Sequence, residues 1–177
     1  MKNIMKNKMS RLLVLAFLIL GTTTVSFAQM KPAKMSPPNT KREVTIKASA
    51  NVVWKLIASL EKVEEYVPAL VKSSLADGNG LEAVREMVMA DGKPRLEEVQ
   101  IYDPANKTIA FKPFDEYLPT TYLSVYYRII AQGPNKCKVS MSGYFKAKEG
   151  ESEGKIIKQL GSEFSKTLKG LKTYLEK

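Results

Sequence analysis

The stretch REVTIKASANVVWKLIASLEKVEEYVP, residues 42–68, contains the succession of patterns that decides the fold. Its first seven residues alternate polar and apolar side chains, which predicts a β-strand. Ser49 is a helix-capping residue type, and apolar residues then recur at helical spacing as far as Leu60. A second, short helix is predicted around 63–67, and Pro68 ends it because proline cannot continue a helix. The stretch therefore predicts one strand followed directly by two helices.

The remainder of the chain predicts a sheet closed by a long helix. Residues 71–146 show strand patterns separated by turn sequences rich in Gly, Pro, Asn and Asp, which is typical of an antiparallel meander. Residues 154–175 predict an amphipathic helix with one apolar stripe, formed by Ile157, Leu160, Phe164, Leu168, Leu171 and Leu175. These elements predict an α+β, helix-grip fold, in which a curved antiparallel sheet wraps around the final helix. A lipocalin barrel is disfavoured because it has no helix pair after its first strand.

The first 28 residues are typical of a secretory signal peptide. Four basic residues precede the apolar run 12–20, and Ser26 and Ala28 place small side chains at the −3 and −1 positions of a cleavage site. The run is shorter than the roughly 20 residues that span a bilayer, although an uncleaved membrane anchor remains an alternative. We expect cleavage after Ala28 and export to the periplasm or beyond. Residues 29–40, with three prolines, predict a flexible leader, so that the folded domain covers residues 41–177.

The composition excludes several classes of chemistry. The 177 residues include no histidine and one cysteine, Cys137, so imidazole catalysis, imidazole-ligated metals and an intrachain disulfide are excluded. We expect no metal and no cofactor. Cleavage removes four basic residues and no acidic ones, which lowers the net charge from +10 to +6, and the lysines are scattered among acids, so nucleic-acid binding is not expected. The lysines of the last helix predict a solvated face, with transient contact with a membrane surface as the alternative.

A series of short motifs between residues 43 and 175 occurs in a characteristic order and spacing. The series consists of IKASANVVW at 46–54, Tyr66-Val67-Pro68, Val84-Arg85-Glu86-Met87, Ala90-Asp91-Gly92, Glu97 six residues before Asp103, and Leu118-Pro119 with Tyr122. In these motifs the chain resembles the polyketide cyclase/dehydrase and lipid-transport group of the START-related helix-grip superfamily, often labelled SRPBCC. The resemblance implies an apolar cavity between the concave face of the sheet and the long helix. Members use such a cavity for lipids, sterols, polyketides or other hydrophobic molecules, and only some are enzymes.

Period-two alternation along the strands, in agreement with the resemblance, predicts which side chains face this cavity. The predicted ligand-binding residues of the sheet are Arg85, Met87, Met89, Glu97, Val99, Ile101, Phe111, Val139, Met141 and Gly143, and the long helix adds Leu160 and Phe164.

Two assignments stay open for the strand that follows Leu118-Pro119. Burial alone would turn one set of residues inward, namely Leu123, Val125, Tyr127 and Ile129. The resemblance instead implies the alternate set as ligand-binding residues, and we adopt this assignment, with Tyr122, Ser124 and Tyr126 facing the ligand. Leu123, Val125 and Tyr127 would then form an exposed apolar patch, which is typical of a surface for a protein partner.

Arg85 and Glu97 are charged side chains on the predicted cavity face, where burial is costly unless a charge is paired or serves a ligand. A turn at Asp91-Gly92-Lys93 would place Glu97 opposite Met87 and one step from Arg85. Three roles stay open for the pair. It grips a polar group of the ligand, it acts in catalysis with Glu97 as acid/base beside Tyr122, or it is a structural ion pair.

The leading hypothesis is an exported, non-enzymatic binder or carrier of a hydrophobic small molecule or lipid. Met87, Met89 and Met141 favour it because flexible thioethers suit a cavity that adapts to its ligand, although methionines also fill irregular cores. Gly161 removes side-chain bulk where the helix covers the sheet, which is consistent with a void. Two alternatives stay open. One is a cofactor-free cyclase or dehydratase that uses Glu97 with Tyr122 and Arg85, and the other is a periplasmic accessory protein that binds another protein.

Overall fold

The computed structural model describes residues 36–114 and 116–177, and residues 37–177 form one compact unit. The elements follow in the order β1 (Thr40–Ile46), α2 (Ala50–Ala58), α3 (Val63–Tyr66), β2 (Val71–Asp77), β3 (Val84–Met89), β4 (Pro94–Asp103), β5 (Thr108–Pro113), β6 (Thr120–Gly133), β7 (Lys136–Ala147) and α4 (Glu153–Leu175). The predicted signal peptide and most of the predicted leader lie outside the described residues.

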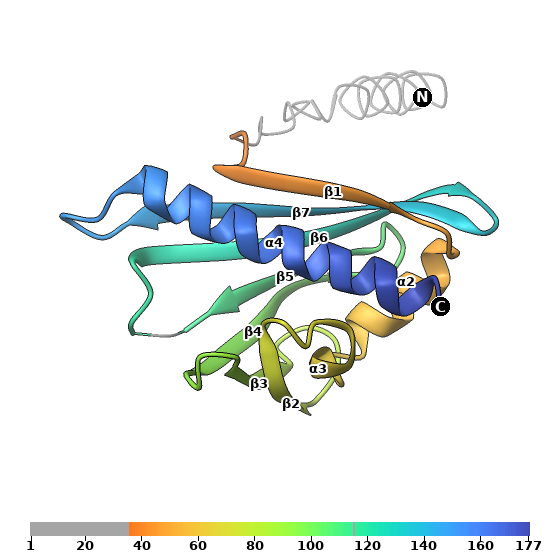
Figure 1. The fold of residues 1–177 in the computed structure, drawn as a ribbon, viewed down its shortest axis with the longest axis horizontal. Helices are drawn as coiled ribbons and strands as arrows, with labels where there is room; N and C mark the ends of the chain where they lie inside the picture. Colours follow the sequence, from red (N-terminus) through yellow and green to blue (C-terminus); the bar gives the residue numbers. More distant parts are fainter. Residues whose placement is uncertain (1–35, 115) are drawn as a thin grey trace, which may run out of the picture. The chain divides into compact units, whose positions relative to one another are not determined.

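The strands form one curved sheet, and the long helix crosses its concave face (Figure 1). Neighbouring strands pair antiparallel in the order β1-β7-β6-β5-β4-β3-β2. The predicted α+β helix-grip fold is confirmed.

The stretch 42–68 folds into the predicted strand and helix pair. Ser49 has an extended backbone, and its side-chain oxygen accepts a hydrogen bond of 3.3 Å from the backbone nitrogen of Val52, which caps α2. On the buried face of α2, Trp54 packs against Tyr102 of β4 with ring centroids 5.4 Å apart. Through this contact α2 covers the end of the sheet at which β4 ends.

The helix α4 is held by an apolar face and by a close approach to α3. Its buried residues include Ile156, Leu160, Phe164, Leu168 and Leu171, whereas Ile157 and Leu175 of the predicted stripe are only half-buried. A Cβ atom at Gly170 would collide with the backbone carbonyl of Tyr66, so glycine at this position allows α3 and α4 to touch. Within the described ranges, no helix is both long and apolar enough to cross a membrane.

The turn between β3 and β4 sets the register of the charged residues. It consists of residues 90–92, with Gly92 at a φ of +87° and the backbone nitrogen of Met89 donating to the carbonyl of Lys93 at 2.8 Å. This turn lies one residue earlier than predicted. Arg85 is therefore directly opposite Glu97, and the prediction that Met87 opposes Glu97 is wrong, because the glycine with positive φ supplies the last position of the turn and not its middle.

Two further local expectations are wrong. The pairing of β4 with β5 is irregular between Val99 and Ile101, so the alternation changes there and Ile101 is exposed instead of facing inward. Gly161 opens no void, because a Cβ atom there would lie 2.5 Å from Nη2 of Arg42. The glycine makes room for this side chain of β1.

Candidate ligand-binding cavity

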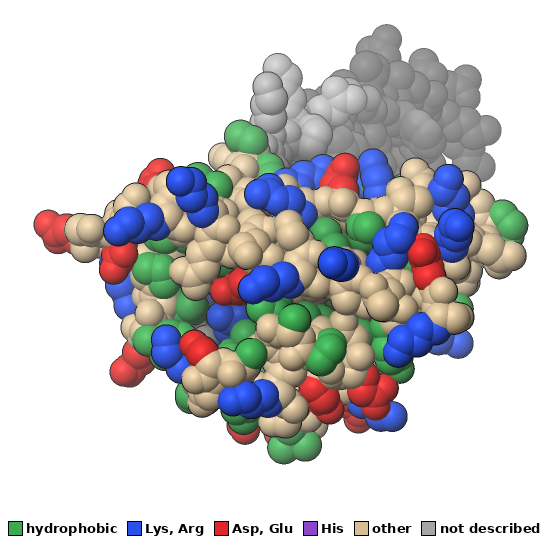
Figure 2. All heavy atoms as spheres, viewed as in Figure 1, with side chains coloured by type: hydrophobic (Ala, Val, Ile, Leu, Met, Phe, Trp, Pro, Cys, Tyr) green, Lys and Arg blue, Asp and Glu red, His purple; other side chains and the backbone are tan. Residues whose placement is uncertain are grey.

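A cavity lies between the concave face of the sheet and α4. Its wall is largely apolar and includes Met87, Met89, Phe111, Leu123, Val125, Met141, Leu160 and Phe164. It contains about 810 Å³ of space, including the part open to solvent at its mouth, but little of that space is wide enough for a water molecule. In the same view as Figure 1, hydrophobic side chains are visible in the recess below α4 (Figure 2). A bulky ligand must spread the walls, which flexible methionine side chains allow.

An ion pair lies in the inner part of the cavity. Arg85 and Glu97 are opposite each other on β3 and β4, with Nη2 of Arg85 2.5 Å from Oε2 of Glu97 and side chains that are 6% and 9% exposed. The Arg85 guanidinium also lies 4.4 Å from the ring centroid of Phe111. Burial alone would lower the pKa of Arg85, but the Glu97 carboxylate raises that pKa above its ordinary value. The positive charge of Arg85 is therefore balanced by the Glu97 carboxylate within the cavity wall.

Two buried tyrosines interact electrostatically with this ion pair. Tyr127 lines the cavity, and its ring packs edge-on against Phe111 with centroids 5.8 Å apart. Burial raises the pKa of Tyr127 and the pKa of Tyr66 above the ordinary value of tyrosine. Both hydroxyl groups are therefore neutral at physiological pH.

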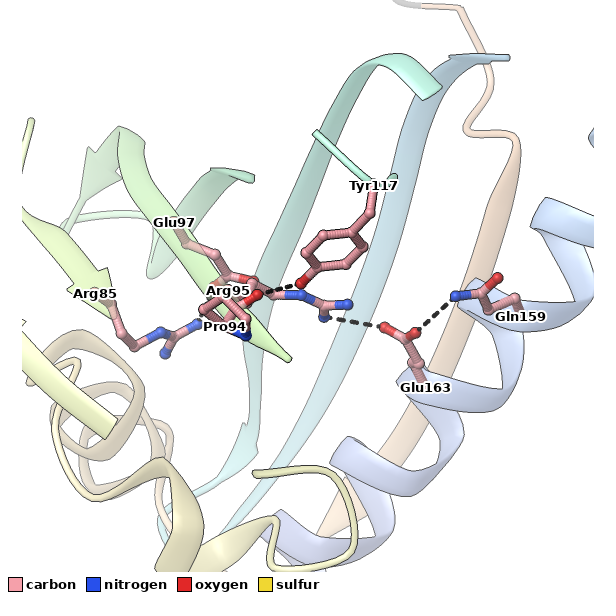
Figure 3. Close-up of polar contacts among 7 residues, drawn as sticks. All are labelled: Arg85, Pro94, Arg95, Glu97, Tyr117, Gln159 and Glu163. Carbon is pink, nitrogen blue, oxygen red and sulfur yellow. Dashed lines mark hydrogen bonds and ion pairs between the residues drawn. The ribbon is translucent and has the colours of Figure 1, made fainter. Parts of the chain in front are cut away.

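A second ion pair crosses the mouth of the cavity. Nη1 of Arg95 on β4 lies 3.2 Å from Oε2 of Glu163 on α4, and the two side chains are 15% and 21% exposed. Nε2 of Gln159 donates a hydrogen bond of 3.3 Å to Oε1 of Glu163. Figure 3 shows Arg95 reaching from the sheet toward the helix, with the inner ion pair on the side away from Glu163. Beyond the outer pair the cavity meets a wider, open hollow that Lys93 and Lys166 help to line.

Comparison with known proteins identifies the family. A family model described as polyketide cyclase/dehydrase and lipid transport matches residues 37–176. The chain belongs to this family. No curated protein matches the chain.

Solved structures share the fold of this polyketide cyclase/dehydrase and lipid-transport family member at low sequence identity. An uncharacterised protein from Bacillus thuringiensis is 21% identical, with a TM-score of 0.69 over 78% of this chain and 98% of the other. A START superfamily protein from Mycobacterium smegmatis is 15% identical, with a TM-score of 0.64 over 77% of this chain and 96% of the other. Norcoclaurine synthase from Thalictrum flavum, solved with dopamine and hydroxybenzaldehyde, is 15% identical, with a TM-score of 0.61 over 75% of this chain and 83% of the other. At these identities the likeness shows the fold alone.

In this family member, regular alternation on the middle strands brings one group of the predicted site residues to the cavity wall. The group consists of Arg85, Met87, Met89, Glu97, Phe111 and Met141 from the sheet, with Leu160 and Phe164 from α4.

Three other predicted residues of the sheet are enclosed but do not line the cavity. Val99 and Val139 are fully buried in the packed core. Gly143 lies against Phe164, and a Cβ atom there would be 3.2 Å from Cζ of that ring. The inner face of the sheet is therefore longer than the cavity, and close packing fills the remainder of it.

The assignment adopted for β6 is wrong. The residues of this strand that line the cavity are Leu123, Val125 and Tyr127. Tyr122, Ser124 and Tyr126 do not line the cavity. Tyr122 is 47% exposed, and the ring of Tyr126 packs against the ring of Tyr144, with centroids 5.2 Å apart. Burying the more apolar set decides the face of the strand, and a register irregularity between Thr120 and Tyr122 separates the strand from the Leu118-Pro119 motif. The exposed apolar patch expected for a protein partner is therefore not formed.

The predicted catalytic trio is not assembled. Glu97 is bound by Arg85 in the buried ion pair, while Tyr122 lies outside the cavity. Sequence reasoning also missed the outer ion pair. Arg95 could have been found because it lies two residues before Glu97 and so shares its face of the strand. Glu163 gave no comparable signal, since it lies beside the apolar stripe of α4 and not within it.

Proposed function

We propose that the chain is an exported, non-enzymatic binder or carrier of a hydrophobic small molecule or lipid. The observation that carries this proposal is the apolar cavity, in which every charged side chain contributed by the described residues has an oppositely charged partner. Such a wall favours a ligand with an apolar body, because the charges of the wall are already paired with each other and need no charged group from the ligand. The family description, which names lipid transport beside cyclase and dehydrase chemistry, supports the proposal. Export rests on the signal-peptide pattern of the first 28 residues.

Binding of a neutral fluorescent probe, N-phenyl-1-naphthylamine, tests the proposal because its emission rises in apolar surroundings. We expect saturable binding to the unmodified protein and loss of binding in Val125→Trp, because the indole fills the cavity that Val125 lines. Tyr122→Trp is the matched control, since it places the same side chain on an exposed position of the same strand. No binding to the unmodified protein, or equal binding to both variants, would contradict the proposal.

Native mass spectrometry of the protein recovered from an exported fraction would identify the natural ligand. We expect a bound mass that is released by denaturing extraction and that belongs to a hydrophobic compound. A bound mass that is retained in Val125→Trp would count against the cavity as its site.

A further inference from the structure

We propose that the ligand is an amphipathic acid, whose apolar part enters the cavity and whose anionic head takes the place of Glu163 beside Arg95 at the mouth. This inference rests on the proposed function and specifies the chemical class of its ligand.

The charged side chains of the wall form an ordered series from the interior to the mouth. Among the described residues, four charged side chains line the cavity, in the order Arg85, Glu97, Arg95 and Glu163. The first two lie on neighbouring strands of the sheet and are nearly inaccessible, at 6% and 9% exposed. Arg95 shares its face of β4 with Glu97, and Glu163 belongs to a different element, α4. The charges therefore alternate along the path that a ligand follows inward.

The outer ion pair is the one that a ligand can open. Its contact is longer, 3.2 Å compared with 2.5 Å for the inner pair, and its side chains are more exposed. It also joins the sheet to the helix, so it can separate without breaking strand pairing. Both of its residues line the cavity and the hollow outside it, which places the pair at the boundary that a ligand must cross.

The surroundings of the outer pair favour an anionic head over a cationic one. If an anion replaces Glu163, the displaced carboxylate stays beside Gln159, which already donates to it, and one turn from the exposed Lys166. The hollow outside the pair is lined by Lys93 and Lys166 as well as Asp91, so among the described residues an approaching anion meets more positive than negative charge there. A carboxylate or phosphate also matches the planar donor geometry of guanidinium. The surroundings of Arg95 therefore favour a carboxylate or phosphate head over a cationic one.

The wall inside the outer pair suits the apolar part of such an acid. The cavity wall includes flexible and branched side chains such as Met87, Leu123 and Met141. The inner ion pair satisfies its own charges, so a second charged group on the ligand has no partner at that depth. The expected ligand thus carries one charged end.

Three ligands with the same twelve-carbon chain separate charge from hydrophobicity: dodecanoic acid, dodecanol and dodecylamine. Each is titrated, below its aggregation concentration and near neutral pH, against protein loaded with N-phenyl-1-naphthylamine. We expect the acid to displace the probe at about tenfold lower concentration than the alcohol, and the amine to be the weakest competitor. Equal competition by acid and alcohol, or stronger competition by the amine, overturns the inference while leaving the proposed function intact. Failure of the probe to bind at all would be a failure of the proposed function instead.

Two variants test the role of Arg95 and Glu163. Arg95→Gln should abolish the preference for the acid over the alcohol. Glu163→Gln should strengthen binding of the acid about tenfold, because it removes the competing carboxylate, and should leave the alcohol unchanged. A damaged fold would not strengthen binding of the acid, and retained binding of the neutral probe shows that the cavity of each variant is intact. Glu153→Gln, at an exposed position of the same helix, is the matched control. An unchanged affinity of Glu163→Gln for the acid would overturn the exchange.

Discussion

Arg85 and Glu97 place two full charges in a wall that is otherwise largely apolar, and each is tolerated because of the other. The contact of 2.5 Å joins side chains that are almost fully buried, so neither charge is solvated by water. A buried pair of this kind adds little net stability compared with an apolar pair of the same volume, but removal of one partner leaves a buried charge. Of the three roles that the sequence left open for Arg85 and Glu97, this geometry supports a structural ion pair.

Glu97→Gln should lower the stability of the fold sharply, because it removes the carboxylate from the buried Arg85 guanidinium. We expect a loss of about 3–5 kcal/mol in the free energy of unfolding, measured by urea denaturation. Glu98→Gln is the control, since the adjacent residue points to the other face of β4. The double variant Arg85→Met with Glu97→Met should be less destabilised than Glu97→Gln, since no charge remains buried. Similar losses in Glu97→Gln and Glu98→Gln would refute this account.

At the scale of elements, the sequence predicts best what is decided locally. The cap at Ser49, the helical spacing after it and the glycine-rich turns each lie within a few residues, and the elements form where these patterns predict. Register and facing depend on distant contacts. The turn before Lys93 lies one residue earlier than predicted, and this shift changes which residue is opposite Glu97. Which side chains of β6 face inward is decided by burial in the hydrophobic core, to which many distant residues contribute. The Arg95–Glu163 contact joins residues 68 positions apart, so spacing gives no sign of it.

The packing of α4 against α3 depends on the absence of a side chain at Gly170. A Cβ atom there would overlap the backbone carbonyl of Tyr66, and backbone cannot move aside as a flexible side chain can. Gly170→Ala should therefore destabilise the protein by about 1–3 kcal/mol, measured as a shift in urea or thermal unfolding. Gly154→Ala, in the first turn of the same helix, has room for the methyl group and should be neutral or slightly stabilising. If both variants are equally stable, the close approach does not constrain the helix.

At the scale of the whole molecule, α4 is held unequally at its two ends. Its C-terminal part is tied to the start of the fold, with Nζ of Lys172 donating to the carbonyl of Thr45 at 2.8 Å and Glu176 accepting from the backbone nitrogen of Lys47 at 2.7 Å. The cavity and the outer ion pair lie along the N-terminal half of the helix. Ligand access is therefore expected to spread the sheet and helix at the mouth, while the far end of α4 stays in place.

A carrier that works outside the cytoplasm must first lose its signal peptide, and substitutions at the predicted cleavage site test this step. Signal peptidase requires a small side chain at the −1 position, which the pattern assigns to Ala28, whereas the residue before it, Phe27, is already large. In a secreting bacterial host, the intact mass of the unmodified protein should correspond to a chain that begins at Gln29. Ala28→Trp should retain the first 28 residues, whereas Phe27→Trp should be processed normally. An unmodified protein that keeps those residues would refute cleavage and favour an uncleaved membrane anchor, so that any ligand would be bound at the membrane surface.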